Sequence, residues 1–384
     1  MSGTTHRPAL RNRTDADPAT PAATPTAENV VDPDDRDPEP TDVAAGHRRP
    51  PYAKSLAVAL AAAAAVAGIL IAFSWPTLTA EPRDVRLAIT GQPQLVQQVG
   101  GALSRQADGG LDLQVVVDRD AAISQIRQRE VVGALILEPR APEVLIASAA
   151  GTGPTQLMNR LSDDLRARLT QQATAAHQPP PKLTITDLVP YAADDSSGTR
   201  LMIAALPLVI GGVLGGALLS IALTGRGQQL VGLGGFAVAG GFGLAAILHY
   251  WYGALPGDYP VFASVIALAL LAMASVVIGL RRLLGRAGIG VAAALFILGG
   301  NPISGASVPR EFLPEPWGAV GQAMPQGAAA NLLRDLAYFP DAAIGTGWLV
   351  LGCWASAGLL LIMIAGRPQR AAMPTATDST ATSR

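Results

Sequence analysis

The stretch 299–326 reads GGNPISGASVPREFLPEPWGAVGQAMPQ and follows directly on the apolar run Ala287–Leu298. Up to Gly300 this run would extend about 21 Å as a helix, whereas the hydrocarbon core of a membrane is about 30 Å thick. Asn301-Pro302 cannot continue a regular helix, because proline removes a donor and clashes with the preceding turn. Since exposed backbone is not tolerated in lipid, we expect residues 301–308 to be buried among helices or to line a wet cavity.

The composition of the whole chain indicates a polytopic membrane protein with polar appendages. Of its 384 residues 49% are hydrophobic and 15% are charged, and a net charge of -1 gives no sign of a nucleic-acid partner. With Cys353 as the one cysteine and no histidines at metal-ligand spacing, neither an intrachain disulfide nor a metal site is expected. Lys54 and Lys182 both lie outside any Walker loop, so we expect no cofactor, and another chain must bind ATP if ATP is used. The frequent use of Arg and Ala with very few Lys is typical of proteins encoded by GC-rich bacterial genomes.

The two ends of the chain are polar and the first apolar run lies between residues 55 and 75. Residues 1–50 and 367–384 carry too little apolar surface to offset ordering entropy, and we expect disordered cytoplasmic tails there. A secretory signal peptide is the competing interpretation of 55–75. Its leader would be unusually long, and the run exceeds a typical signal-peptide core, so we predict an uncleaved first transmembrane helix.

Residues 84–190 have the pattern of a small α/β domain. Short β-rich segments occur at 85–90, 111–117, 131–137, 143–149 and 182–189. Between them, 93–106, 120–130 and 154–172 have the apolar spacing of helices. The order β-α-β-α-β-β-α-β predicts a domain with its own core, and no nucleotide-binding glycine fingerprint, carboxylate pair or catalytic triad stands out within it.

The membrane pattern returns after residue 200. Further spans are predicted at 201–223, 230–252, 261–280, 287–308 and 346–366. With six spans, one side collects the residues Arg48, Arg49, Lys54, Arg226, Arg281, Arg282, Arg286, Arg367 and Arg370. The short loops of the other side hold Arg310 and Arg334. The positive-inside rule therefore predicts a multi-pass protein of the cell membrane with both termini cytoplasmic and residues 76–199 extracytoplasmic.

The segment that follows the break, up to residue 340, alternates apolar and polar residues and contains further prolines. Its charges exclude it from the hydrocarbon core, so we predict a re-entrant or amphipathic outer segment at 301–340 with Trp317, Tyr338 and Phe339 as surface anchors. We expect Glu311 and Glu315 to be solvated. The predicted fold class is thus a polytopic α-helical membrane protein with six transmembrane helices, this outer segment and a small α/β extracytoplasmic domain.

The break at Asn-Pro and Ser-Gly, followed by P-x-x-F-L-P-x-P-W and M-P-Q-G-A…L-L-R-D…Y-F, resembles the type-2 ABC exporter permease family. The matching positions are Asn301, Pro302, Gly305, Pro309, Phe312, Leu313, Pro314, Trp317, Pro325, Gly327, Arg334, Tyr338 and Phe339. Six spans with a large domain between the first and second are similar to the subgroup of large-ectodomain permeases.

The resemblance implies a half-transporter among membrane lipids that forms a homodimer, or a heterodimer with a second permease, and is driven by a separate ATP-binding subunit. ATP hydrolysis would belong to that subunit, not to this chain. The outer segment would help to close the extracellular gate, with candidate residues Asn301, Pro302, Gly305, Pro309, Phe312, Pro314, Trp317, Pro325 and Arg334. Arg226, in the loop 224–229 between the second and third spans, is the candidate contact with the ATP-binding subunit. Apolar spans with few charges favour a lipophilic or amphipathic cargo.

Two other classes of function stay open from the sequence. A membrane-anchored sensor or scaffold, whose ectodomain binds a ligand or a cell-envelope partner, would explain the α/β domain but not the broken fifth span. A membrane-embedded enzyme would need ionisable groups that face a cavity, and the spans contain almost none.

Overall fold

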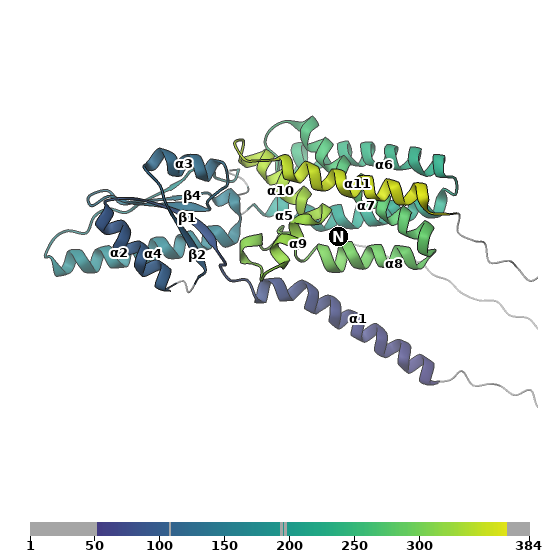
Figure 1. Cartoon of the computed structure of the whole chain (residues 1–384), viewed down its shortest axis with the longest axis horizontal. Helices are drawn as coiled ribbons and strands as arrows, with labels where there is room; N and C mark the ends of the chain where they lie inside the picture. Colours follow the sequence, from purple (N-terminus) through teal and green to yellow (C-terminus); the bar gives the residue numbers. More distant parts are fainter. Residues whose placement is uncertain (1–51, 107–108, 193–194, 196–197, 367–384) are drawn as a thin grey trace, which may run out of the picture. The chain divides into compact units, whose positions relative to one another are not determined.

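The computed structural model describes residues 52–106, 109–192, 195 and 198–366 (Figure 1). It divides into two units within the first helix, α1 (Tyr52–Leu78), between Ala57 and Val58. The predicted tails at 1–50 and 367–384 lie outside the described residues. The larger unit begins at Val58.

The predicted α/β part contains a five-stranded sheet in the order β2-β1-β3-β4-β5. Its strands are β1 (Val85–Gly91), β2 (Leu111–Val115), β3 (Gly133–Leu137), β4 (Glu143–Ile146) and β5 (Thr184–Asp187). The strand β4 runs antiparallel to β3 and the other neighbours are parallel. Every residue of the central strand β3 is buried, because helices cover both faces of the sheet, and this explains its unbroken apolar sequence. The predicted order of strands and helices is confirmed.

The helices α2 (Pro93–Gln106) and α4 (Thr152–Ala175) cover one face of the sheet and α3 (Arg119–Arg127) covers the other (Figure 1). On the first face Leu103 and Met158 pack with Leu135. On the second face Ile126 packs with Ala134. The helix α3 begins where the Asp118 side chain accepts a hydrogen bond from the backbone N–H of Ala121 at 2.8 Å, an N-cap that the sequence DRDAA favours. A short 3₁₀ turn, η1 (Ser148–Ala150), leads from β4 to α4.

Five of the described helices are long and apolar enough to cross a membrane. Besides α1 they are α5 (Thr199–Ala222), α6 (Arg226–Ala246) with its π-helical end η2 (Ile247–Trp251), α7 (Tyr259–Leu284) and α11 (Gly345–Ile364). The helix α7 is largely buried and contacts α5, α6 and α11. Glycines make these close approaches: a Cβ on Gly216 would lie 2.8 Å from Cα of Ala274. The chain is therefore mostly helical, as expected of a polytopic membrane protein.

The helical part of the predicted span 287–308 ends at Gly300, as Asn301-Pro302 predicts. Its regular part, α8 (Ala287–Ala293), widens into the π-helical η3 (Ala294–Gly300) and stops. The N–H of Asn301 still donates to Phe296 O at 3.0 Å, but Pro302 has no N–H to donate and Gly305 takes a left-handed φ of 81°. After irregular turns the chain forms η4 (Arg310–Phe312), α9 (Trp317–Ala323) and α10 (Pro325–Tyr338).

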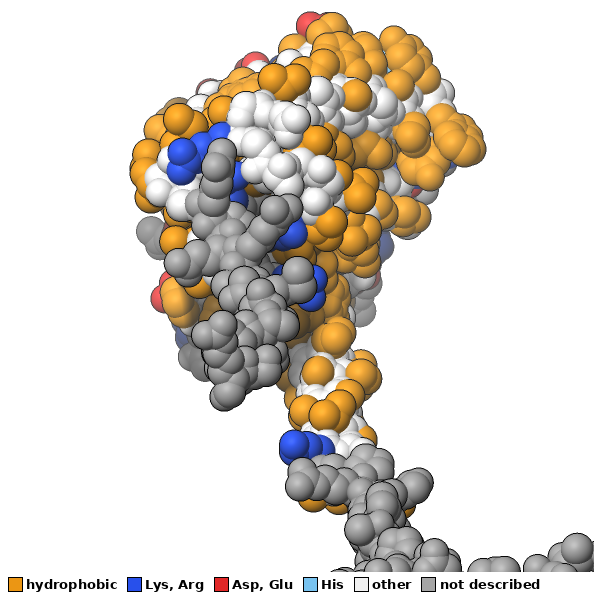
Figure 2. Space-filling view, turned by 90° about the vertical axis from the view of Figure 1, so that its right-hand side faces the viewer, with side chains coloured by type: hydrophobic (Ala, Val, Ile, Leu, Met, Phe, Trp, Pro, Cys, Tyr) orange, Lys and Arg blue, Asp and Glu red, His pale blue; other side chains and the backbone are white. Residues whose placement is uncertain are grey.

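Basic side chains gather at the end of the bundle where α11 finishes. Figure 2, which faces this end, shows Lys and Arg side chains near the helix ends and hydrophobic side chains over the helix flanks. Arg226 donates to the carbonyl of Ala365 at 2.8 Å, and Arg281 donates to the carbonyl of Ser220. Cations beside helix C-termini satisfy carbonyls that have no partner within the helix.

Candidate functional site

The irregular segment 301–309 is enclosed by backbone of α9 and α10. Gly305 and Pro309 are buried. A Cβ added to Gly321 of α9 would overlap the carbonyl oxygen of Ile303, and one added to Gly327 of α10 would overlap the carbonyl oxygen of Gly321. Glycine is therefore needed where these backbones meet. The expectation of burial among helices is confirmed for Ile303, Ser304, Gly305 and Val308, whereas Ser307 is exposed. Such packing is what makes non-helical backbone tolerable at membrane depth.

A buried glutamine of α10 stabilises the π-helical end of the broken helix. The Nε2 group of Gln326 donates to Phe296 O at 3.0 Å. That contact depends on Gly300, because a Cβ at this position would overlap Gln326 Nε2. Pro325 directly before it is buried at the first turn of α10, where its missing N–H costs no hydrogen bond. The second glycine of the pair before Asn301, Gly300, thus has a packing reason that the pattern alone did not show.

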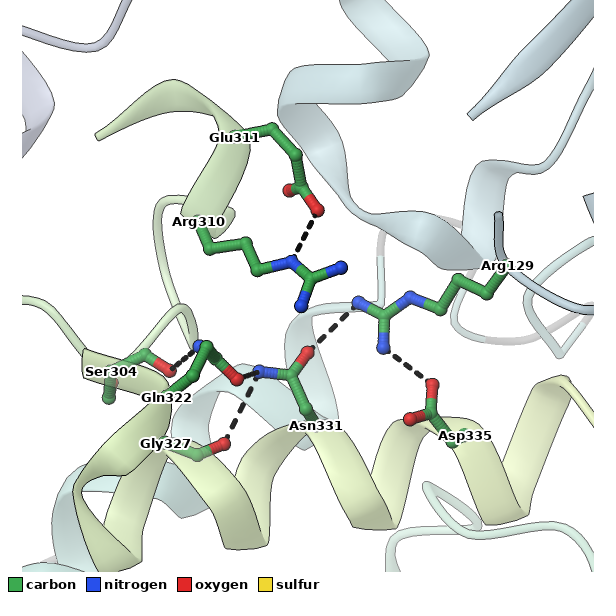
Figure 3. A network of polar contacts seen from close by, with 8 residues as sticks. All are labelled: Arg129, Ser304, Arg310, Glu311, Gln322, Gly327, Asn331 and Asp335. Carbon is green, nitrogen blue, oxygen red and sulfur yellow. Dashed lines mark hydrogen bonds and ion pairs between the residues drawn. The ribbon is translucent and has the colours of Figure 1, made fainter. Parts of the chain in front are cut away.

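A ladder of polar side chains joins the α/β part to the irregular segment, and Figure 3 shows it from close by. Arg129, which follows α3, donates to Asn331 Oδ1 of α10 at 2.9 Å. Asn331 donates to Gln322 Oε1 at 2.5 Å and to the carbonyl of Gly327 at 3.3 Å. Gln322 of α9 in turn donates to the carbonyl of Ser304 at 3.2 Å. We call Arg129, Asn331, Gln322 and Ser304 the polar ladder.

Arg129 is held at the top of the polar ladder by three further features. Its Nη1 lies 2.5 Å from Asp335 Oδ1, and the two side chains are 22% and 15% exposed. Its guanidinium carbon lies 5.6 Å from the ring centroid of Phe339, in cation–π range. Its own backbone has a left-handed φ of 57°, which is uncommon for a residue with a side chain. The contacts with Asp335 and Phe339 hold this long and otherwise flexible side chain in one orientation.

Apolar contacts also join the irregular segment to the start of the sheet. Phe312 packs with Val85 and Val308. The chain before β1 forms backbone hydrogen bonds with the same turn: Arg83 N–H donates to Glu311 O at 2.9 Å and Glu81 N–H donates to Phe312 O at 3.2 Å. A movement of 301–312 would therefore be transmitted to the edge of the α/β part.

The predicted gate residues are mostly brought together here. Asn301, Pro302, Gly305, Pro309, Phe312 and Pro325 are buried or half-buried around the irregular segment. Pro314 is half-buried beside them, and Trp317 is 44% exposed with its ring 6.0 Å from that of Trp75. Arg226 lies elsewhere, at the start of α6, and is exposed. The roles of these residues in gating stay predictions.

Two predicted membrane-surface anchors are wrong. Phe339 is 1% exposed and belongs to the core on one face of the sheet. The ring of Tyr338 packs edge-on against Tyr191 at 5.4 Å, and its hydroxyl donates to Ala254 O at 3.2 Å. The reason is that the end of α10 and the residue after it pack into the core of the α/β part, beside residues such as Ala149 and Val189.

Glu311 is likewise not a freely solvated side chain. It is 27% exposed and lies 2.8 Å from Arg310 Nε. Burial opposes ionisation of this carboxyl, but the charge and hydrogen bond of Arg310 outweigh burial and hold the pKa of Glu311 below its ordinary value. Glu315 is exposed, as predicted.

Sequence reasoning missed Arg129, Gln322 and Asn331. The two amides could have been noticed as polar positions among Ala, Gly and Leu in short helices that carry other residues of the motif. No sequence signal identifies Arg129. It lies 202 residues from Asn331, and it is one of several arginines in its region with nothing in the sequence to distinguish it.

A buried arginine of α10 lines an apolar cavity in the helical part. Arg334 is 6% exposed. The cavity has a volume of about 210 Å³ and lies among α5, the end of α6, α7 and α10. Burial and the nearby Arg129 cation lower the pKa of Arg334, although a guanidinium stays charged. Among the described residues no hydrogen-bond acceptor reaches its Nε or Nη1.

A larger groove lies in the α/β part, between α2 and α4. Its volume is about 780 Å³, and its walls combine apolar residues such as Leu95 and Leu169 with the charged residues Arg105, Glu138 and Arg168. This groove lies on the face of the sheet opposite to α3, away from the polar ladder. It has the size of a small-molecule site.

Within the described ranges no three His, Cys, Asp or Glu residues are grouped to hold a metal ion. The chain matches no protein-family model, and none of the curated protein sequences matches it.

Proposed function

We propose that this chain is the membrane-spanning permease subunit of an ABC-type exporter, dimeric and driven by a separate ATP-binding subunit. The observation that carries the proposal is the short apolar helix that stops at Gly300 and continues as largely buried, non-helical backbone. Broken helices of this kind mark transport pathways in membrane proteins. The motif around the break and its resemblance to type-2 exporter permeases supply the transport class.

In this proposal the chain crosses the cell membrane six times, with α8 and η3 as the fifth crossing and both termini in the cytoplasm. The arginines at the end of the bundle where α11 finishes support this orientation through the positive-inside rule. The α/β part then lies outside, above the segment 301–340, which serves as the extracellular gate. Cargo is lipophilic or amphipathic and moves outward.

The polar ladder would couple movement of the gate to movement of the α/β part. Because Ser304, Gln322 and Asn331 are linked in series to Arg129, the irregular segment and the α/β part move together. ATP-driven displacement of the helices would shift α10, and the shift would reach both ends of the polar ladder. Interfaces of this kind have discrete arrangements rather than continuous ones.

The test of the proposal is affinity purification of the tagged chain from its native membrane in mild detergent. We expect an ATP-binding subunit to co-purify near one-to-one and to lose this association when Arg226→Glu reverses the charge at the start of α6. Arg286→Glu, at an exposed arginine of the neighbouring loop, is the matched control. Absence of any ATP-binding subunit in several detergents would contradict the proposal.

A second candidate function is a membrane-anchored sensor or scaffold, and the groove between α2 and α4 is the observation that favours it. In that case a ligand of the α/β part would bind without any ATP-binding subunit. The affinity purification separates the two functions, because an envelope partner bound to the α/β part would be retained in place of an ATPase.

A further inference from the structure

Arg334 is a buried cation that forms no ion pair with any described residue, although Asp335 and Glu311 are near enough to act on its charge. It is 6% exposed, and the carboxylate of the next residue, Asp335, is already paired with Arg129. In the part of the chain that the structure describes, Nε and Nη1 of Arg334 have no hydrogen-bond acceptor. A buried charge without a partner is costly, so this position favours an incoming anion.

The surroundings of Arg334 are apolar and reach the flank of the helical part. The cavity of about 210 Å³ that Arg334 lines is otherwise walled mainly by aliphatic side chains of α5, α6 and η2. Two residues of its wall, Ile203 and Ile247, are 59% and 37% exposed. The cavity is therefore continuous with the apolar outer flank of these helices, which faces lipid if they cross a membrane.

A second polar group lines the same cavity. Gln326 is 4% exposed, and its Nε2 donates to Phe296 O, which fixes the orientation of the amide. Its Oε1 is buried and has no donor among the described residues. The cavity is thus lined by the Arg334 cation, which can pair with an anionic group, and by walls that suit hydrocarbon.

We propose that this cavity binds the head of an anionic amphiphile, with its phosphate or carboxylate on Arg334 and its hydrocarbon chain along α5 and η2. The inference deepens the transport function proposed above by naming the class of cargo, and it rests on that function for calling the ligand a cargo. A free inorganic anion would pair with Arg334 but would make no apolar contacts with the cavity walls. A neutral lipid would fill the walls and leave the charge unpaired.

The test uses the purified full chain in a neutral maltoside detergent, without any ATP-binding subunit. Dodecyl phosphate, dodecanol and inorganic phosphate are added separately, and the temperature of thermal unfolding is followed. A ligand that binds the folded state raises this temperature with its concentration. We expect a rise with dodecyl phosphate and little or none with dodecanol or inorganic phosphate at equal concentrations.

Arg334→Met removes the charge and keeps an apolar side chain in the same space. We expect dodecyl phosphate to bind this variant about ten- to hundredfold more weakly, because a charge-assisted pair is lost. Since the lost charge has no partner in the free protein, the ligand-free unfolding temperature should stay the same or rise. Arg334→Lys, which keeps the charge, should retain a weakened response. Arg310→Met, at an exposed arginine of the same outer segment, should behave as the wild type.

Three results would overturn the site: an equal response to dodecanol, an equal response to inorganic phosphate alone, or an unchanged response in Arg334→Met. A lower ligand-free unfolding temperature in Arg334→Met with the response retained would give Arg334 a structural role instead. None of these results depends on an ATP-binding subunit. Failure of the site is thereby distinguishable from failure of the transport function, which the affinity purification tests.

Discussion

At the scale of single residues, Arg129 connects the two halves of the larger unit. Its guanidinium uses separate nitrogens for Asp335 and Asn331 and lies over the ring of Phe339. A planar fork with several donors can do this, whereas the single ammonium of a lysine cannot. Asp335 and Asn331 are both largely covered, so each would be left unsatisfied if the arginine were lost.

We therefore predict that Arg129→Ala loosens α10. A hydrogen bond to a charged group contributes about 2 kcal/mol, which corresponds to roughly thirtyfold faster exchange of backbone amides through local opening. Hydrogen exchange followed by mass spectrometry on peptides from 325–338 measures the effect.

Arg127→Ala is the matched control, because Arg127 is exposed at the end of the same helix α3. In an Asp335→Asn background the effect of Arg129→Ala should shrink, as expected for two residues that interact directly. Equal exchange in the Arg127→Ala and Arg129→Ala proteins would show that the contact with α10 is not held by this side chain.

At the scale of elements, the broken helix depends on local chemistry and on packing in different ways. Asn301-Pro302 predicts the break correctly, because a proline ring excludes a regular helix whatever surrounds it. The π-helical widening of the last turns before the break was not predictable in this way, because Gln326 stabilises it from another helix. That contact spans 30 residues of sequence and has no local signal.

The strands and helices of the α/β part were predictable for a similar reason. Their alternation of β-rich and helical patterns is local, and every predicted element is present with ends shifted by a few residues. Tyr338 and Phe339 were misjudged because an aromatic pair beside a membrane span is typical both of a lipid interface and of a covered protein contact. The deciding fact, the packing of these two side chains into the core on one face of the sheet, is a long-range contact.

At this scale we predict that Gly305→Ala destabilises the protein. Gly305 has a φ of 81°, where a side chain costs about 1–2 kcal/mol, and its Cβ would lie 3.0 Å from Gln322 Nε2 of the polar ladder. Gly290→Ala in α8 is the control, since nothing lies within 4 Å of an added Cβ and a helical glycine gains from the change. Thermal unfolding in detergent should show a lower midpoint for Gly305→Ala alone. A lower midpoint for both variants, or for neither, would contradict the role given to Gly305.

At the scale of the whole molecule, the proposed topology requires an even number of crossings. Five helices of the described residues are long enough to cross by themselves, and α8 with η3 would supply the sixth. Because the regular helix stops at Gly300, the packed turns that follow would cross the remaining depth. This arrangement places the loop before α8 and the loop after α10 on opposite sides.

Single cysteines in a Cys353→Ser background test this topology. Glu130→Cys and Asp341→Cys should react with a membrane-impermeant maleimide in intact cells. Thr224→Cys and Arg286→Cys should react only after permeabilisation. All four positions are exposed, so differences in labelling report the side of the membrane rather than burial. Labelling of Arg286→Cys and Asp341→Cys from the same side would leave α8 and η3 outside the set of crossing elements.

The most direct test of the central claim is the rate of ATP hydrolysis by this chain together with its co-purified ATP-binding subunit in lipid nanodiscs. The account predicts that hydrolysis depends on this chain, and that Gly305→Ala slows it severalfold while Gly290→Ala does not, with both complexes intact by size-exclusion chromatography. If the intact Gly305→Ala complex hydrolyses ATP at the wild-type rate, or if hydrolysis does not depend on this chain, the broken helix is not the moving part of an ABC-type exporter.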